Sequence, residues 1–400
     1  MSPSSFLLTA INRAWFANWL RKPFLIFLVA VGVRFGVVGV LLENKQPSWN
    51  VNEAAGIARQ LAAGHGFSSP YHDASGPTAW VAPVYPSLLA GMFRLFGTET
   101  PASAWAAVSL NILFGSLTAL VILKAGKHFF GEFTGLLAAW AWAVSPPTVV
   151  MPWFVWETCL SALVMTWLLL YTLRLKEPSP TRAWTFCGAM WGAVAMVNPS
   201  LLAPLPFLVV LIAWRSASWK RAAMLVGVCI LCITPWTVRN YVALGSLVPV
   251  RSNFWPEAFF GNVSFELHPS GKSMLYQREG EVAFARDLRA RLVEYLKSDP
   301  REFGSRTIHR VWNFWTQPRQ FSPFPLLLFL TSMWGLFLAW RARLEWQAFA
   351  CVLAIYPLPY YFTYTFARYR HPIEPLMFLL ASYAVSRCVA GTGVSALMKP

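Results

Sequence analysis

Long apolar runs divide this chain of 400 residues, and each is close to the length that a helix needs to cross a membrane. A span takes about 20 mostly apolar residues, and fewer where a helix is short or buried in a bundle. In the stretch 183–214, Asn198-Pro199 favours two short spans over one long span, because a proline disfavours helix at the preceding residue. The predicted spans are 23–42, 102–123, 133–151, 157–173, 183–197, 200–214, 222–238, 324–340, 347–366 and 373–389. The sequence therefore predicts an all-α, polytopic membrane helix bundle of about ten spans.

The composition agrees with a membrane protein. Hydrophobic residues make up 56% of the chain and charged residues 12%, whereas soluble domains have about 25% charged residues. A net charge of +16 is also typical of nucleic-acid binding, but here lysine and arginine flank apolar runs or lie in one large loop. We therefore expect membrane lipids, and no nucleic acid, as partners. All six cysteines fall within apolar runs, which indicates neither a disulfide framework nor a metal site.

The short loops predict an orientation. With the N-terminus in the cytoplasm, the short loops rich in lysine and arginine lie on the cytoplasmic side, with one exception. The first apolar run follows Arg21 and Lys22 and is too long for a signal peptide, so we expect it to remain as an anchor. The predicted parts are a cytoplasmic N-terminus (1–22), a membrane bundle (23–238) with an outer loop (43–101), an outer segment (239–323), C-terminal spans (324–389) and a cytoplasmic tail (390–400). We expect a multi-pass protein of the plasma (inner) membrane with a periplasmic outer face.

The stretch ARYRHPIEP breaks this pattern, because Arg368, Arg370 and His371 lie in a short outer loop. Three interpretations remain open. The arginines pair with Glu374, with lipid headgroups or with acids of the large loops. Alternatively, the three residues hold the phosphate of a lipid-linked substrate, since guanidinium forks match phosphate oxygens. In the third, they line an ion or solute path of a transporter.

The first outer loop predicts two interfacial helices with a functional segment between them. Apolar residues recur at helical spacing over 51–63, and a second apolar face follows Pro86. The intervening loop is rich in Gly, Pro, Ser and Tyr and contains His72 and Asp73, which suggests a substrate-lining segment.

Carboxylates are scarce, which narrows the choice of a catalytic base. We expect Glu53 to take a proton from an acceptor hydroxyl or amine, with Asp73 as the second candidate. A solvated helix carboxylate is the alternative for Glu53. Glu157, at the outer end of a span, either caps or pairs structurally or belongs to the site.

The second outer segment predicts a small, mostly helical part before the eighth span. One charged amphipathic helix extends to about Lys297 and another begins after Pro300. A polar group among aromatic residues precedes them: Arg239, Asn240, Arg251, Asn253 and Asn262.

Three blocks together resemble the glycosyltransferase C superfamily, near the family of protein O-mannosyltransferases and lipid A aminoarabinose transferases. They are NEAAGIARQLAAGHGFSSP with APVYPSLLAG, then PWTVRNY with VRSNF and GN, and finally ARYRHPIEP. The resemblance implies a helix bundle with interfacial helices, a polyprenyl-phosphate sugar donor and reaction on the non-cytoplasmic side. It also implies, as a rule, inversion at the sugar carbon.

The expected site follows from the residues and the resemblance together. Its catalytic residues are Glu53 and Asp73, and its donor phosphate-binding residues are Arg368, Arg370, His371 and Arg239. Its substrate-lining residues are Arg59, His72, Tyr85, Glu157, Asn240, Asn253 and Tyr369. The relatives carry an Asp-Glu pair in the first loop, where this chain has Asn50 or Asn52 in place of the aspartate. The acceptor is a lipid, glycan or protein, and a divalent metal is the one cofactor left open.

Two other classes remain as alternatives. A transporter or lipid flippase needs polar groups along a path within the membrane, whereas charges inside the predicted spans are few. Arg34 is one of them, and we expect it to pair with an acid of a neighbouring helix. A catalytically inactive membrane scaffold is the other alternative, and it agrees with the missing aspartate.

Overall fold

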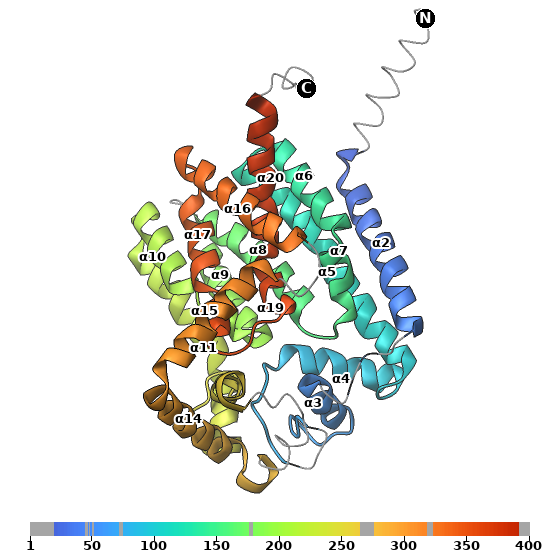
Figure 1. Cartoon of the computed structure of the whole chain (residues 1–400), viewed down its shortest axis with the longest axis vertical. Coiled ribbons are helices and arrows are strands. Elements are labelled where there is room, and N and C mark those ends of the chain that lie inside the picture. The colour runs from blue at the N-terminus through green and yellow to red at the C-terminus, as the bar shows by residue number, and fades with distance from the viewer. Residues whose placement is uncertain are drawn as a thin grey trace, which may run out of the picture.

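The computed structural model describes residues 20–44, 47, 49, 52–71, 75–175, 179–264, 276–317 and 323–391. Almost all regular structure in these ranges is helical, and their one β pairing is an isolated bridge between Ser68 and Pro77. The predicted all-α fold is therefore confirmed. The first turns of α2 and the last turns of α20 lie at one end of the molecule, and α3, α4 and α14 lie at the other (Figure 1).

The helices follow the apolar runs and the two outer segments. The bundle contains α2 (Pro23–Asn44), α5 (Pro101–Phe129), α6 (Glu132–Val144), α7 (Pro146–Val150), η2 (Met151–Trp153), α8 (Thr158–Leu173), α9 (Thr181–Val197), η3 (Pro199–Leu202), α10 (Leu205–Ser216), α11 (Trp219–Leu244), α16 (Phe324–Arg341), α17 (Trp346–Ile355), α18 (Leu358–Phe362) and α20 (Glu374–Gly391). The outer part contains α3 (Glu53–Ala62), α4 (Val84–Phe96), α12 (Phe254–Phe259), the π-helix η4 (Phe260–Ser264), α14 (Glu281–Ser298), α15 (Pro300–Thr316), α19 (Ala367–Arg370) and η6 (His371–Ile373).

Five helices of the described residues are long and apolar enough to cross a membrane, and a sixth span results if the pair Glu132–Val144 and Pro146–Trp153 is counted as one. That pair is bent by 56°. Two shorter helices, α8 and α9, and the 18-residue helix α20 occupy other predicted spans. The predicted total of ten spans stays a prediction.

Proline sets the helix breaks. The helix α9 ends at Val197, and Asn198 has an extended backbone and accepts a hydrogen bond from the Ser200 amide. The predicted division of 183–214 into two helices is thus confirmed. At the start of α7, Pro146 and Pro147 have no N–H to donate to the carbonyls of Trp142 and Ala143 in the last turn of α6.

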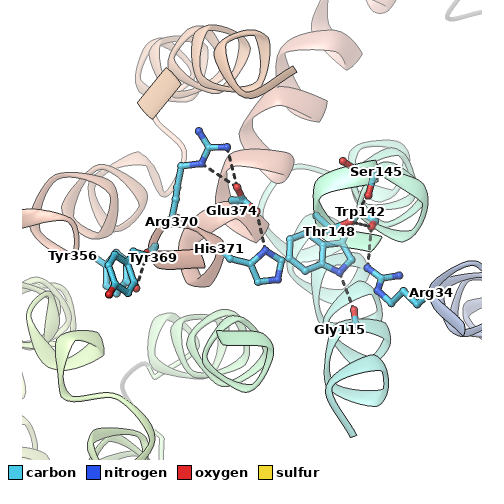
Figure 2. Close-up of polar contacts among 10 residues, drawn as sticks. All are labelled: Arg34, Gly115, Trp142, Ser145, Thr148, Tyr356, Tyr369, Arg370, His371 and Glu374. Atoms are coloured by element: carbon cyan, nitrogen blue, oxygen red, sulfur yellow. Dashed lines mark hydrogen bonds and ion pairs between the residues drawn. The ribbon is translucent and has the colours of Figure 1, made fainter. Parts of the chain in front are cut away.

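Arg34 of α2 satisfies these carbonyls (Figure 2). Its guanidinium donates to Trp142 O at 3.2 Å and to Ala143 O at 3.0 Å, and the side chain is fully buried. Thr148 Oγ1 also donates to Trp142 O, at 2.6 Å. The prediction that Arg34 pairs with an acid of a neighbouring helix is therefore wrong. The arginine caps a proline-broken helix, where carbonyls without a donor would otherwise be buried.

Small residues allow close helix contacts. Gly126 of α5 lies against Gly135 of α6, and Gly335 of α16 lies against the backbone of Leu380 in α20. A Cβ at any of these glycines would overlap the neighbouring backbone. Such contacts are typical of membrane helices, which associate by van der Waals packing.

The outer helices form a cap on the bundle. Ala54, Ala55 and Ala58 of α3 pack with α4 and with the ends of α2 and α5 in one hydrophobic cluster. The helices α3, α4, α14 and α15 confirm that the predicted segments are helical, and the boundary between α14 and α15 falls at Asp299 and Pro300 as expected. Their location on the outer side stays a prediction.

Candidate active site

A cavity of about 410 Å³ lies where the outer segments meet the bundle. Five stretches contribute most of its wall: 52–54, 81–86, 153–158, 251–257 and 359–369. Its charged lining residues are Glu53, Glu157, Glu257, Arg251 and Arg368. The cavity therefore combines three carboxylates with two guanidinium groups.

Glu53 is the first residue of α3, at an end of a helix that favours negative charge. The preceding Asn52 fixes this end in two ways. Its Oδ1 accepts a hydrogen bond from the Ala55 amide at 3.1 Å, and its Nδ2 donates to Val155 O at 2.7 Å. Gly56 allows the helix to approach the Pro70 carbonyl, which a Cβ would overlap. The Glu53 carboxylate is thus held on a rigid element beside the 153–158 wall.

Arg368 reaches the cavity from α19 and is oriented by aromatic rings. Its guanidinium carbon lies 4.3 Å from the ring centre of Trp156 and 5.2 Å from that of Phe366. Among the described residues it forms no ion pair with a carboxylate within 4.0 Å. Burial lowers the pKa of Arg368, but Tyr369, Glu157 and Glu53 together raise that pKa above its usual value. The Arg368 guanidinium is therefore a cation in a fixed orientation, with N–H groups that can donate hydrogen bonds to a ligand.

Arg251 is the second cation of the cavity, and the sequence had given it no specific role. Its Nη2 donates to Ser200 Oγ at 3.1 Å. It stands in the VRSNF block near a span end, which was the only signal in the sequence. Glu257 was also missed, because nothing local in the sequence links it to the other residues of the cavity.

Arg370 and His371 do not line the cavity; they form a buried network with Glu374 (Figure 2). Arg370 donates to Glu374 Oε1 from Nε at 3.0 Å and to Trp315 O from Nη1 at 2.6 Å. The Nδ1 atom of His371 lies 2.8 Å from Glu374 Oε2, and the imidazole stacks on Trp142 with ring centres 4.9 Å apart. For Arg370, these contacts agree with the interpretation in which it pairs with Glu374.

Three more residues expected in the site are held elsewhere. Arg239 donates to the carbonyls of Thr78 and Phe67, at 2.6 and 2.7 Å, and so ties the first outer loop to α11. Asn240 donates to Val248 O at 2.9 Å. Arg59 forms an ion pair of 2.6 Å with Glu99. None of the three lines the cavity, so their contacts indicate structural roles.

Of the other expected residues, Tyr85, Glu157, Asn253 and Tyr369 line the cavity. The hydroxyl of Tyr85 donates to Asn111 Oδ1 at 3.2 Å. The ring of Tyr369 stacks on Tyr360 with centres 4.6 Å apart, and burial raises the pKa of Tyr369 to about 12. His72 and Asp73 lie outside the described residues, so the second candidate base stays a prediction.

The lining residues offer a carboxylate that can accept a proton, and guanidinium groups that can bind an anion. Within the described ranges, no group of three or more His, Cys, Asp and Glu side chains is placed to hold a metal ion.

Comparison with known proteins gives a family match over part of the chain. Residues 80–238 match the family described as dolichyl-phosphate-mannose-protein mannosyltransferase. That range includes the 81–86 and 153–158 walls of the cavity. A search of curated protein sequences gave no match.

Two solved structures are similar to this chain. The archaeal oligosaccharyltransferase AglB from Archaeoglobus fulgidus, in complex with an inhibitory peptide and a dolichol-phosphate, is similar over 96% of this chain, with a TM-score of 0.56 and 13% identity. This chain spans about half of that protein's length, 52%. ArnT from Cupriavidus metallidurans, bound to undecaprenyl phosphate, has a TM-score of 0.42 and 15% identity over 96% of this chain and 80% of ArnT. The AglB fold and the family match confirm the resemblance to the glycosyltransferase C superfamily.

Proposed function

We propose that this chain, which has the fold of the glycosyltransferase C superfamily, is an integral membrane glycosyltransferase that moves a sugar from a polyprenyl-phosphate donor to an acceptor. The observation that carries the proposal is the cavity in which Glu53 and the two cations Arg251 and Arg368 come together. This is the combination that transfer from a lipid phosphate requires: a base for the acceptor and cations for the leaving group. The match to a dolichyl-phosphate-mannose-dependent family over residues 80–238 supports the same class of donor.

Arg368 and Arg251 hold the donor phosphate in this account. A guanidinium donates two parallel hydrogen bonds to phosphate oxygens, and its charge persists at any physiological pH. Arg368 suits the role because aromatic rings orient its guanidinium. Within the described residues, it forms no ion pair with a carboxylate. Arg370, His371 and Arg239, which the sequence suggested for this role, instead maintain the shape of the surrounding structure.

The transfer step is a single displacement at the sugar carbon. Glu53 accepts the proton of the acceptor hydroxyl or amine as the acceptor atom bonds to that carbon. The bond from the carbon to the phosphate oxygen breaks, and its electron pair stays on the polyprenyl phosphate. Negative charge grows on the phosphate, and the two arginines stabilise it. One displacement of this kind inverts the configuration of the sugar carbon.

The reaction is assigned to the non-cytoplasmic face of the plasma membrane. Two points support this side: the short loops rich in lysine and arginine fall on the opposite face in the predicted topology, and residues of the two segments predicted to be outer line the cavity. The parts of the chain outside and inside the membrane then follow the boundaries expected from the sequence.

The purified full-length chain tests this function directly. Labelled polyprenyl-phosphate sugars are supplied with a membrane-lipid extract, a peptide pool or a glycan pool, and both sugar transfer and free polyprenyl phosphate are measured. We expect one donor to be consumed with transfer to one class of acceptor. Movement of labelled donor across sealed vesicles without chemical change would instead establish a transporter. No consumption and no movement would leave the scaffold.

A further inference from the structure

Glu257 brings a second carboxylate to the cavity from a distant part of the chain. It lies on the short helix α12, in the second outer segment, whereas Glu53 begins α3 in the first. Both side chains line the same cavity. The alternative acid position beside Glu53 is occupied by Asn52, whose amide is already bonded to Ala55 and Val155.

The helix α12 is anchored on its other side. Ala258 and Phe259 are buried in a hydrophobic cluster with Phe284 and Leu288 of α14. The guanidinium of Arg289 lies 4.7 Å from the ring centre of Trp255, which adds a second contact between these helices. With this face turned to α14, Glu257 remains on the face that borders the cavity.

The segment after α12, at residues 261–262, is fixed to residues 361–363, which precede Arg368 in the chain. Asn262 Nδ2 donates to Phe362 O at 2.9 Å, and Arg310 donates both to Gly261 O at 2.6 Å and to Tyr361 O at 3.1 Å. Gly261 lies so close to Thr363 that a Cβ would overlap the Thr363 carbonyl. These contacts fix the position of Glu257 relative to the 359–369 wall of the cavity, which includes Arg368.

Two buried phenols, those of Tyr71 and Tyr364, lie in the part of the structure around α12. Tyr364 lines the cavity, and Tyr71 belongs with it to the hydrophobic cluster around α12. Their side chains are 7% and 9% exposed, and within the described residues neither hydroxyl has a hydrogen-bond partner. Burial raises the pKa of both phenols, and Glu53 and Glu257 raise them further, so the four groups are electrostatic neighbours. Buried hydroxyls without a partner are rare in native structures, and at the wall of a cavity such a hydroxyl is available to a substrate.

We propose that Glu257 is a second catalytic carboxylate, which holds the nucleophilic hydroxyl or amine of the acceptor while Glu53 removes its proton. This inference rests on the proposed function. The proton passes to Glu53, the acceptor atom bonds to the sugar carbon, and the phosphate departs with the bonding electrons. Glu257 accepts a hydrogen bond from the acceptor and fixes the direction from which the acceptor atom approaches the sugar carbon. Holding the reacting atoms in line in this way raises the rate strongly. The phenols of Tyr71 and Tyr364 form the donor side of the same acceptor site.

A double-mutant cycle tests the assignment. Transfer is measured with varied acceptor for the wild type, Glu53→Gln, Glu257→Gln and the double variant. Glu294→Gln, an exposed glutamate of α14, is the matched control. We expect Glu257→Gln to lower kcat roughly 100-fold and to raise the acceptor KM, with the donor KM unchanged. Groups that act on one proton are non-additive, so the double variant should be no slower than the slower single variant.

The outcomes separate this inference from the function on which it rests. A wild type that consumes no donor would remove the proposed function and this inference with it. An active wild type with an equally active Glu257→Gln, or with losses that multiply in the double variant, would overturn this inference alone. If Glu257→Gln does not fold, Glu257→Asp decides, since it keeps the charge. We expect that variant to fold with a reduced kcat, and full activity would contradict the assignment.

Discussion

The guanidinium of Arg368 lies 4.3 Å from the ring centre of Trp156, and this contact turns an arginine of α19 toward the cavity. Arg370, two residues later, is fully buried on the other side of the same short helix. Side chains two positions apart on a helix do not face each other. A single turn of helix therefore separates a cation available to substrate from a cation that stabilises the fold.

Arg368→Ala should lower kcat/KM for the donor about 100-fold, because the phosphate loses a forked contact as its charge develops. Arg368→Lys should fall between this variant and the wild type, since a lysine keeps the charge but not the fork. Initial rates at limiting donor measure the effect. Arg278→Ala, an exposed arginine of the outer segment that pairs with Glu279, is the control and should match the wild type. Full activity of Arg368→Ala would refute its role.

Arg370→Ala should act on stability. It leaves Glu374 buried without its guanidinium partner, and removing one member of a buried ion pair costs about 3–5 kcal/mol. Thermal unfolding in detergent should show a clear loss of stability, which Arg368→Ala should not. A stable Arg370→Ala with weakened donor binding would instead support the phosphate role that the sequence suggested.

Arg34→Met should destabilise the bundle because Ala143 O loses its donor, whereas Trp142 O keeps the hydrogen bond from Thr148 Oγ1. A buried polar group without a partner costs about 1–3 kcal/mol. Arg34→Lys should recover part of the loss, because an ammonium group has three donors. Thermal unfolding compares the two variants. Equal stability of Arg34→Met and the wild type would show that the capping contacts contribute nothing.

Asn52→Asp should not increase transfer, although it introduces an acid beside Glu53. The Asn52 amide nitrogen donates to Val155 O at 2.7 Å, and a carboxylate there would face that carbonyl without a proton to share. We expect a lower unfolding temperature and no gain in kcat. A faster enzyme would indicate that position 52 belongs to the catalytic machinery.

Much of the fold could be predicted from the sequence because a membrane-spanning helix requires a long apolar run, which is visible in the sequence. Proline gave the breaks, at Asn198 and again at the boundary between α14 and α15. Glu53 and Arg368 were both predicted for the site, and both line the cavity. These predictions depended on local pattern and topology, which a sequence carries directly.

The other assignments required the tertiary structure. The sequence showed that ARYRHP concentrates cations, but not which of them is buried in the bundle and which lines the cavity. The burial of Arg370 depends on its partner Glu374, and that of His371 on its contact with Trp142. It did not link Glu257 to Glu53, because the two lie about 200 residues apart in the sequence and come to the same cavity only in the folded chain. Arg239 was predicted to bind the donor phosphate, and this role stays a prediction; the structure shows that its guanidinium ties the first outer loop to α11.

The most direct test of the central claim is release of free polyprenyl phosphate by the purified wild type and by Glu53→Gln, with Glu294→Gln as a control for the fold. The account predicts release with sugar transfer by the wild type and the control, and a loss of at least 100-fold in Glu53→Gln at unchanged thermal stability. Equal release by a folded Glu53→Gln would contradict the assignment of the cavity's base.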